Sequence, residues 1–318
     1  MNRMRILHLD NTANVAHLIT IGLRELGVDS DVMMLSPHKF NYPLDYENYF
    51  GRSLASKFKC ILNTIKIGKD YDIIHSHGGI TWNRYDLVFL KNIMKKSLVV
   101  HYHGSEVLTP RSYGLDGDSY GLHFMNIVDK KIVSAPELLK RLPEAEHILN
   151  PMILGTYSWN DKKKLKIVHL PSRRQFKGTD VICEAIKRVQ NINNNFDFKL
   201  IENVSFDIAM KEMSNSNIVI DQMYPRGYYG MVSLEAMSTG KIAVCYLKPE
   251  YRFGVPIISP ESPTIDALTD VLLDLISCNK RNDLQNLSER CYDYIRIHRD
   301  PKIIAKRYLS IYEEVLRK

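Results

Sequence analysis

The sequence is poor in the features that mark specialised classes of protein. Its 318 residues include 5 cysteines, 2 tryptophans, 16 glycines and 13 prolines. The cysteines are odd in number, widely spaced and never arranged as Cys-x-x-Cys, which argues against a disulfide-stapled scaffold and a zinc ribbon. No apolar run reaches the roughly 18 residues that a membrane span requires. The first ten residues carry charge, which predicts that there is no signal peptide and that the protein is cytoplasmic.

The composition that remains is that of a globular protein with a moderate excess of positive charge. Hydrophobic residues make up 45% and charged residues 25%, and the length predicts about two domains. The net charge is +7, from 43 Lys and Arg against 36 Asp and Glu. Residues 1–155 hold 18 cations and 16 acids (+2), which leaves 25 and 20 (+5) for the rest. The excess suits an anionic ligand or surface and falls mostly in the second half.

Short apolar runs alternate with helical patterns along the whole chain. Residues 5–9 predict a strand, and residues 15–26 predict a helix that ends at Gly27. Further strands are expected at 30–35, 71–75, 98–102, 131–134, 147–149, 166–170, 198–201, 218–221 and 242–246, and further helices at 54–67, 179–189, 231–238 and from 265 onward. This alternation predicts an α/β fold built from two Rossmann-like, doubly wound parallel sheets that face a central cleft.

The alternation of strands and helices is interrupted at residues 151–164, where proline, glycine and a run of lysines predict a linker. We therefore expect an N-terminal domain at 1–155 and a C-terminal domain at 156–299. The last helix, 300–318, begins at a proline and is expected to cross back to the first domain.

A basic loop between a strand and a helix is the strongest local signal. Arg173, Arg174 and Lys177 precede Gly178 where the helix at 179 begins. A helix N-terminus offers unpaired N–H groups and the positive end of a dipole, and these three cations would complete a site for a diphosphate. The alternative is a solvated basic loop without a ligand.

A second loop, between the strand at 218–221 and the helix at 231–238, contains Gly227 and Gly230. Glycines there permit a ligand to approach the backbone closely. Glu235 lies about one turn inside the helix, where its carboxylate could accept hydrogen bonds from a pair of hydroxyls. The alternative is an ordinary surface glutamate.

These motifs, taken in order, resemble those of a large enzyme family. Lys-Gly at 177–178 is followed about fifty residues later by aromatic-Gly-x₄-Glu-Ala-Met-x₂-Gly-Lys. The first half adds Asp-Ile-Ile-His-Ser-His at 72–77, His-Tyr-His-Gly-Ser-Glu at 101–106, Ser-Ala-Pro-Glu-Leu-Leu at 134–139 and Asn-Pro at 150–151. The combination resembles the retaining GT-B glycosyltransferases of family four, over nearly the whole chain.

The resemblance implies transfer of a sugar, with retention, from a nucleotide-diphosphate sugar to a glycan or lipid-linked acceptor in the building of a cell-surface glycan or glycolipid. It implies no cofactor, no metal and no protein nucleophile. The catalytic set would be His103, Arg174, Lys177 and Glu235, with Arg173 as the alternative phosphate ligand. The donor would also contact Gly178, Gly227, Tyr229, Gly230, Met231 and Val232, and the acceptor side would include Asn11, Thr12, Asn14 and Glu106.

Two positions depart from the family pattern. Gly227 stands where the family has the first glutamate of its Glu-x₇-Glu signature, and the turn at 11–14 replaces a pair of glycines. Asn and Thr in that turn could still cap the following helix. The missing glutamate keeps open the alternative of a non-catalytic relative that only binds a nucleotide sugar.

Two further patterns allow other interpretations. Residues 51–69 carry five cations and no acid, interleaved with apolar residues, as in a helix that lies on an anionic membrane surface. The alternatives are a helix packed on the sheet with a solvated basic face, or a membrane- or polymer-associated scaffold. His75, His77, His101 and His103 could indicate a metal cluster, but no cysteine or carboxylate completes a site, so we expect none. No motif indicates binding to nucleic acid.

Overall fold

A computed structural model describes residues 4–37, 40–49, 51–77, 85–104, 107, 127–159, 164–277 and 281–317. The chain divides into two compact units. The first, here the N-terminal unit, contains Met1–Pro151 and Asp300–Lys318, and the second, the C-terminal unit, contains Met152–Arg299. Both are built on a parallel sheet, so the fold class is α/β, as the alternating pattern predicts.

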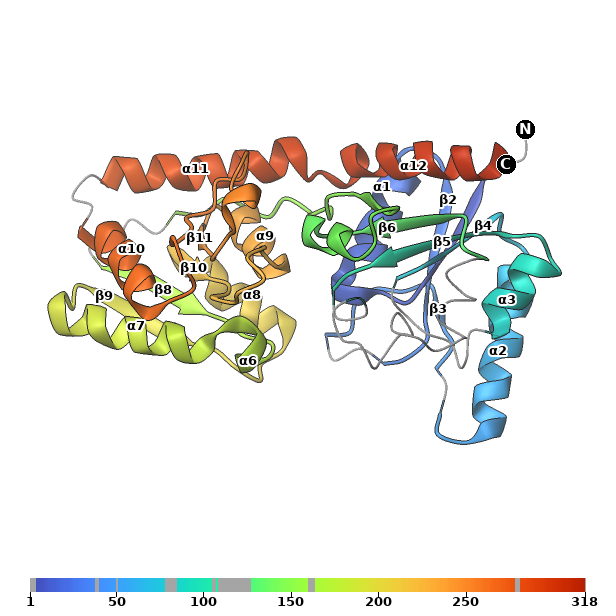
Figure 1. The fold of residues 1–318 in the computed structure, drawn as a ribbon, viewed down its shortest axis with the longest axis horizontal. Helices are drawn as coiled ribbons and strands as arrows, with labels where there is room; N and C mark the ends of the chain where they lie inside the picture. Colours follow the sequence, from blue (N-terminus) through green and yellow to red (C-terminus); the bar gives the residue numbers. More distant parts are fainter. Residues whose placement is uncertain are drawn as a thin grey trace. The chain divides into compact units, whose positions relative to one another are not determined.

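The N-terminal unit has a seven-stranded sheet in the order β3-β2-β1-β4-β5-β6-β7, and every pair is parallel (Figure 1). Its strands are β1 (Arg5–Leu9), β2 (Asp29–Met34), β3 (Tyr46–Glu47), β4 (Ile73–Ser76), β5 (Ser97–Tyr102), β6 (Lys130–Val133) and β7 (Glu146–His147). Its helices are α1 (Val15–Glu25), α2 (Leu54–Gly68), α3 (Tyr85–Asn92) and α12 (Pro301–Arg317), with short 3₁₀ turns η1 (Thr12–Asn14) and η3 (Pro136–Lys140).

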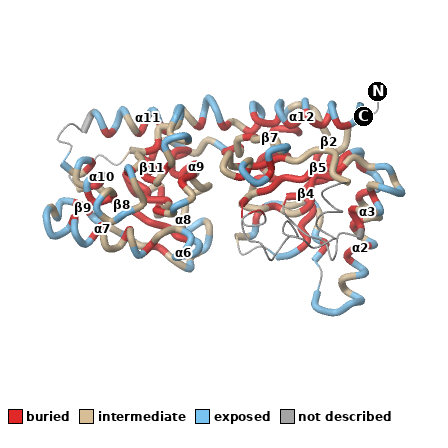
Figure 2. The backbone as a smooth tube through the Cα atoms, in the orientation of Figure 1, coloured by how far each residue is buried: buried red, intermediate tan, exposed pale blue. Residues whose placement is uncertain are grey.

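Alternate residues of the central strands point to opposite faces of this sheet. On one face, Leu7, Ile74 and Leu98 form a core with side chains of α2 and α3. On the other face, His8 and His75 lie opposite each other in register, and Tyr308 and Tyr312 of α12 lie against the histidines. The strands β4 and β5 are buried along almost their whole length (Figure 2).

The C-terminal unit has a four-stranded parallel sheet in the order β11-β10-β8-β9. Helices α7 and α10 pack on one face through an aliphatic core, and α8 and α9 pack on the other. The elements are β8 (Leu165–His169), α6 (Arg174–Lys177), α7 (Thr179–Ile192), β9 (Phe196–Leu200), α8 (Phe206–Ser214), β10 (Ile218–Ile220), α9 (Met231–Ser238), β11 (Ile242–Val244), η4 (Pro249–Tyr251), α10 (Ile265–Ser277) and α11 (Arg281–His298).

The expected strands and helices are confirmed to within about two residues at most ends, but β3, α3, α6 and α8 were not predicted. The expected linker differs, because residues 152–159 pack on the C-terminal unit. The N–H of Gly155 donates to the carbonyl of Ser238, and that of Ser158 donates to the carbonyl of Thr239. Among the described helices, none combines the length and the apolar character needed to cross a membrane.

Candidate functional site

The centre of the candidate donor site in the C-terminal unit is an ion pair between Lys177 and Asp221. Lys177 ends α6, which follows β8, and Asp221 directly follows β10, so both lie at the carboxyl ends of neighbouring strands. Lys177 Nζ lies 2.5 Å from Asp221 Oδ1 and donates to Gln222 Oε1 at 3.0 Å. The side chain of Asp221 is fully buried and that of Lys177 is 12% exposed. In sheets of this type ligands bind beyond the carboxyl ends of the strands.

The second carboxylate oxygen of Asp221 organises the start of α9. Oδ2 accepts hydrogen bonds from the N–H of Gly230 and from Ser233 Oγ, each at 2.8 Å. Burial alone would raise the pKa of Asp221, but the Lys177 ammonium and these hydrogen bonds outweigh it and lower the pKa. Asp221 is therefore ionised, and it holds the lysine against the N-terminus of α9.

Gly230 is the point of closest approach between these groups. A Cβ at this position would lie 2.9 Å from Lys177 Nζ and 3.2 Å from Asp221 Oδ2. The absence of a side chain lets the ammonium reach the N-terminal end of α9, where Met231 and Val232 form the first turn. An ammonium beside a helix N-terminus can offer an anion a fixed N–H donor next to the oriented backbone N–H groups.

Glu235 lies on the same helix, one turn further in, and is only partly exposed. Burial and the negative charge of Asp221 raise its pKa from 4.5 to about 7, although Lys177 acts in the opposite direction. Glu235 is thus neither an ordinary surface glutamate nor a permanently charged one. Close to neutral pH it can accept a hydrogen bond as a carboxylate or donate one as an acid.

The two arginines of the basic loop are both exposed but have different surroundings. Arg174 Nη1 donates to Glu202 Oε2 at 2.5 Å, and its Nη2 lies 3.7 Å from Asp180 Oδ1. The Arg173 guanidinium lies over the ring of Phe176, 6.0 Å from its centroid. Arg174 is therefore already partnered by acids on the protein, and the choice between the two as phosphate ligand stays a prediction.

Gly227 occupies a tight turn with a positive φ of 69°. A Cβ there would lie 2.4 Å from Lys248 Cγ and 2.8 Å from the Lys248 backbone nitrogen. Gly178 is similar, with φ 64° and the carbonyl oxygen of Met223 only 2.4 Å from where a Cβ would lie. A side chain at position 227 could not be accommodated without movement of Lys248.

Tyr229 packs into the protein beside this loop. Its ring stacks on Tyr228 with centroids 4.3 Å apart, and Arg299 donates to its hydroxyl. The guanidinium of Arg299 is buried over the rings of Tyr229 and Tyr294. The side chain of Tyr229 thus anchors the loop, and the predicted contact of this residue with the donor stays a prediction.

In the N-terminal unit the turn after β1 is tied to the end of β4. Thr12 Oγ1 donates to the carbonyl of His77 at 2.8 Å. Asn14 has a left-handed conformation and makes no side-chain cap, whereas Asn11 Oδ1 accepts the N–H of His17 in the first turn of α1 at 3.2 Å. Asn and Thr in this turn were both expected to cap the helix. The side chain that accepts a hydrogen bond from a helix N–H is that of Asn11. Glu106 lies outside the described residues.

His103 follows β5 and is the last ring of a hydrogen-bonded chain. Its Nε2 lies 3.3 Å from His77 Nδ1, and its Nδ1 lies 3.4 Å from Ser134 Oγ. His77 Nε2 in turn lies 2.8 Å from His8 Nδ1. Burial lowers the pKa of His77 well below its usual range, and that of His8 to about 3, so these imidazoles are neutral. His103 is therefore oriented from the sheet interior, and its predicted contact with a sugar is untested.

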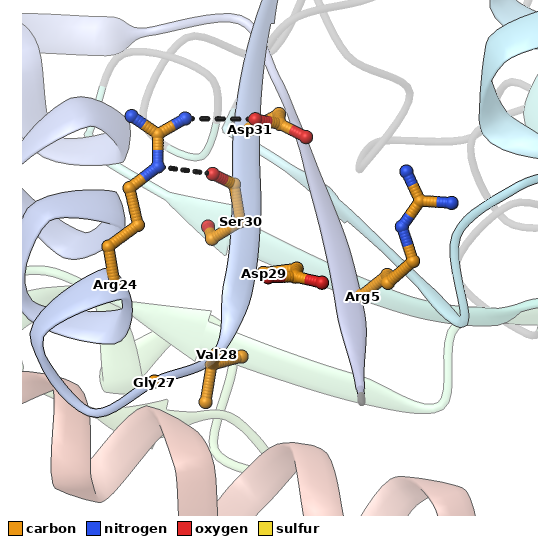
Figure 3. A pocket seen from close by; sticks show the side chains of 7 residues that line it. All are labelled: Arg5, Arg24, Gly27, Val28, Asp29, Ser30 and Asp31. Atoms are coloured by element: carbon orange, nitrogen blue, oxygen red, sulfur yellow. Dashed lines mark hydrogen bonds and ion pairs between the residues drawn. The ribbon is translucent and has the colours of Figure 1, made fainter. Parts of the chain in front are cut away.

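A separate surface cavity of about 330 Å³ lies at the opposite, amino-terminal edge of the N-terminal sheet. It is lined by residues at the starts of β1 and β2, and Figure 3 shows Arg24 pointing toward Asp31 at its rim. Arg24 also donates to Asp45. Because ligands of such sheets bind at the other edge, we assign this cavity no part in the site.

The structure thus brings Lys177, Gly230 and Glu235 together in one unit, and His103 and Thr12 together in the other. Sequence reasoning missed Asp221 as the residue that holds the first group, and it missed Gln222. An acid directly after a buried strand, nine residues before Gly230, was the available signal. His169 was also missed; it joins β8 to Ile220 and to Thr179 of α7, and burial lowers its pKa to about 4.

No protein-family model and no curated protein matches the chain. Solved structures do match it over nearly its whole length. HepE from Anabaena, in complex with UDP-glucose, is 12% identical with a TM-score of 0.68, covering 98% of this chain and 100% of HepE. A glycosyltransferase from Rickettsia africae is 14% identical with a TM-score of 0.63, covering 100% of both chains.

A third match is a candidate UDP-N-acetylglucosamine 2-epimerase from Listeria monocytogenes, 13% identical with a TM-score of 0.59, covering 99% of this chain and 98% of that one. At this level of identity the matches establish the fold. The chain has the GT-B type of fold, with two Rossmann-like domains built on parallel sheets.

Proposed function

We propose that the protein is a glycosyltransferase that takes its sugar from a nucleotide-diphosphate donor, and that the nucleotide is uridine diphosphate. The observation that carries the proposal is the buried Lys177–Asp221 pair against the N-terminus of α9. Support for the uridine nucleotide comes from HepE, which was crystallised with UDP-glucose, and from the Listeria protein, whose name specifies a UDP-sugar.

The charges of the site define what each group would contribute. Asp221 neutralises Lys177, so the pair has no net charge with which to attract a diphosphate. The net positive charge would come from Arg173 and Arg174, and the N-terminus of α9 would add oriented N–H groups. Lys177 would then act locally, as a fixed donor to an oxygen of the leaving diphosphate, where negative charge grows during transfer.

The finer mechanism that we propose is retention without a metal. The acceptor would attack from the face that the diphosphate leaves, and the departing phosphate oxygen would take the proton of the acceptor hydroxyl. The sugar–phosphate bond breaks, the new glycosidic bond forms, and the phosphate leaves as the nucleoside diphosphate. Glu235 would accept hydrogen bonds from the ribose hydroxyls, and His103 would contact a hydroxyl of the sugar.

The acceptor side is proposed to be the N-terminal unit, with a glycan or lipid-linked acceptor and a role in building a cell-surface glycan or glycolipid. The turn at Asn11, Thr12 and Asn14 faces the same sheet edge as His103, because Thr12 is bonded to His77. The predicted role of Glu106, which lies outside the described residues, stays a prediction. We place the protein in the cytoplasm.

Binding is tested by a thermal-shift and calorimetry panel of UDP-, GDP- and ADP-sugars. We expect a UDP-sugar to raise the Tm and Lys177→Ala to weaken its binding by about tenfold to a hundredfold, the loss of one charge-assisted contact. Lys187→Ala, on the exposed face of α7, is the matched control and should bind like the unmodified protein. Absence of binding by every nucleotide sugar at millimolar concentration would falsify the proposal.

Catalysis is tested by incubating the bound donor with lipid-linked and oligosaccharide acceptors. Transfer predicts release of UDP together with a product whose anomeric configuration, read by NMR, matches that of the donor, and no loss of rate in EDTA. Inversion, or a requirement for metal, would refute the finer mechanism only. Binding without turnover would favour the non-catalytic alternative, and a change of sugar configuration without acceptor would favour an epimerase.

We further propose that the N-terminal unit contacts an anionic membrane through α2. Its buried face is formed by Cys60, Ile61, Thr64 and Gly68, while Leu54, Phe58 and Leu62 are 68%, 59% and 50% exposed. The three exposed side chains recur every fourth residue and so lie on one side of the helix. Lys57, Lys59 and Lys66 are interspersed with them, and α3 packs beside α2 (Figure 1).

The sequence pattern did not separate these two faces, because Ile61 and Leu62 both carry apolar side chains. Apolar residues that face solvent between cations suit the interface of an anionic bilayer better than a purely solvated helix. The proposed partner is therefore the inner face of the membrane that holds the lipid-linked acceptor.

Liposome flotation tests this contact. We expect binding to vesicles that contain phosphatidylglycerol, little binding to phosphatidylcholine alone, and loss of most binding in Phe58→Ser with Leu62→Ser. Ile192→Ser, which removes an equally exposed apolar side chain from α7, is the control and should leave flotation unchanged. Equal flotation of both variants, or none of the unmodified protein, would exclude α2 as the membrane contact.

A further inference from the structure

Five histidines from three neighbouring strands lie together on one face of the N-terminal sheet. His8 on β1 is in register with His75 on β4, and His77 and His103 lie two residues after His75 and His101. Neighbouring ring centroids are 4.2 to 5.9 Å apart. His8, His75, His77 and His101 are each fully buried.

In three of these histidines one ring nitrogen is hydrogen-bonded and the other is not. Nδ1 of His8 is bonded to His77, that of His75 to the Tyr312 hydroxyl at 2.7 Å, and that of His101 to the Tyr308 hydroxyl at 3.3 Å. In each ring Nε2 is buried and has no hydrogen-bond partner within the described part of the chain. Buried polar atoms without a partner cost free energy, and three in one cluster call for an explanation.

For His75 this pattern is the one that metal-ligating histidines show. Such a histidine gives one nitrogen to the ion and donates its other N–H to a neighbour, which fixes the ring. Tyr312 is placed to accept from His75 in this way.

We propose that His8, His75 and His77 bind one transition-metal ion of the kind that prefers imidazole ligands, such as Zn²⁺. Each residue offers a ring nitrogen, and the three nitrogens lie within 4.8 Å of one another. Bonds of about 2.1 Å to a tetrahedral ion place nitrogens roughly 3.4 Å apart, so small ring movements complete the site. Both ring nitrogens of His77 are hydrogen-bonded, to His8 and to His103, so binding of the ion through His77 Nε2 would replace its hydrogen bond to His8.

The choice of ion and of ligand set follows from the donors present. Neither candidate set of histidines includes a carboxylate, so hard ions such as Mg²⁺ and Ca²⁺ are disfavoured. A second set, His77 with His101 and His103, shares His77 and uses the histidine proposed to face the sugar. His8 is outside every sequence motif. The expectation of no metal at the other histidines depended on the lack of a cysteine or carboxylate, which a three-histidine site does not need.

Occupancy of this site is measured without substrate, so its test does not depend on the proposed sugar transfer, although His77 also contacts His103. The charge of a divalent ion in this neutral environment opposes binding, so we expect affinity in the micromolar range and not tighter. An occupied site would stiffen the strands β1 and β4 where they meet α12.

The experiment uses the full chain without a polyhistidine tag, stripped with EDTA and dialysed against Zn²⁺ or Co²⁺. We expect about one ion per chain by mass spectrometry, a Tm rise of about 3 °C or more, and the visible absorption of tetrahedral Co²⁺ with nitrogen ligands. His8→Gln should lose all three signals while keeping its circular dichroism. His298→Gln, an exposed histidine on α11, is the matched control and should keep them.

Two results would overturn the proposal. One is the absence of bound metal and of a Co²⁺ spectrum in the unmodified protein at about 100 μM metal, well above a micromolar affinity. The other is an unchanged metal content in a folded His8→Gln variant. If His8→Gln does not fold, His75→Asn and the Co²⁺ spectrum of the unmodified protein decide the question in the same way.

Discussion

At the scale of single residues, the site depends on one carboxylate that has no place in the expected catalytic set. Asp221 uses both oxygens, one for Lys177 and one for Gly230 and Ser233. Its charge also raises the pKa of Glu235, although burial is the larger cause. Asp221 therefore positions Lys177, orders the start of α9 and contributes to the raised pKa of Glu235. Replacing Asp221 would remove all three effects at once.

Glu235 makes the binding of a donor dependent on pH. Its carboxylate is a stronger acceptor for the two ribose hydroxyls than its acid form, in which one oxygen carries a proton, and its pKa in the free protein is about 7. We expect the affinity for a UDP-sugar to rise roughly tenfold from pH 6 to pH 8. At pH 8 Glu235 is already ionised, so binding does not include the free energy of removing its proton. A UDP-sugar is the right probe, since its diphosphate does not titrate in this range. Calorimetry across pH measures the effect.

Glu235→Gln is the control for this prediction, and it should bind with an affinity that is flat from pH 6 to pH 8. A flat profile for the unmodified protein, or a slope that survives in Glu235→Gln, would show that another group titrates. Lys241, whose pKa burial lowers to about 8, would then be the next residue to test.

The same shift predicts a pH dependence of stability without ligand. The pKa of Glu235 is raised in the folded state, so the folded protein holds the proton more tightly than the unfolded chain does. Its contribution is present below pH 4.5 and is lost as pH rises through about 7. Glu235→Gln should therefore stabilise the C-terminal unit at pH 8 by about 2 kcal/mol, allowing for partial exposure. Urea unfolding at pH 5 and pH 8 measures the difference.

Residues of the site were predictable from the sequence where a local pattern carried the signal. The loops holding Lys177 and Glu235 could be found because a strand, a glycine-containing turn and a helix follow one another within a few residues. The partnership of Lys177 with Asp221 spans 44 positions and depends on the neighbouring placement of β8 and β10, which no local pattern encodes. His8 could not be assigned to the histidine cluster from the sequence for the same reason, because β1 and β4 are neighbours only in the folded sheet.

At the scale of secondary structure, prediction succeeded for elements that bury one regular face. The helices α1, α7 and α9 and the strands of both sheets appear close to their expected bounds. The helix α6 has four residues, of which none is buried, and β3 has two residues, so neither carries enough periodic signal to be recognised. The buried and exposed sides of α2 could not be told apart, because both are apolar.

The loop before α9 yields a prediction about its tight turn. Gly227 and Gly254 both have positive φ, at 69° and 74°, but only Gly227 is crowded, by Lys248. We expect Gly254→Ala to cost about 1 kcal/mol, the conformational term alone. Gly227→Ala should cost about 3 kcal/mol, because the Lys248 backbone must also move. Pulse proteolysis across urea concentrations, with fragments identified by mass, compares the two variants.

Gly254→Ala serves as the matched control, because nothing lies within 4 Å of a Cβ at that position. Equal losses in the two variants would mean that the turn at Gly227 adapts without strain. In that case a glutamate could occupy position 227, and its absence would have to be explained by function and not by packing.

At the scale of the whole chain, neighbours in sequence belong to different folding units. The helix α11 ends at His298 in the C-terminal unit, and α12 begins at Pro301 in the N-terminal unit. Between them, Asp300 Oδ1 accepts the N–H groups of Lys302 and Ile303 and so starts a new helix. The helix that begins at the proline was expected to cross back to the first domain, and in the structure α12 belongs to the N-terminal unit, where it packs on α1.

The close packing of α12 on α1 provides the test of this division. A Cβ at Gly22 would lie 2.1 Å from the carbonyl oxygen of Pro301 and 2.8 Å from Ala305 Cβ. Gly22→Ala must therefore push α12 away from α1, and we expect amide hydrogen exchange in both helices to accelerate tenfold or more, about 1.4 kcal/mol of lost protection. Exchange in α11 should stay unchanged, although α11 precedes α12 in the chain.

The control is Gly68→Ala on α2, where the nearest atoms are the flexible ends of the Leu90 side chain at 3.0 and 3.2 Å. It lies in the same unit but not in the α1–α12 contact, so protection of α12 should persist. If α11 were to lose protection together with α12 in Gly22→Ala, the two helices would form one cooperative element. The end of the chain would then couple the stability of the two units.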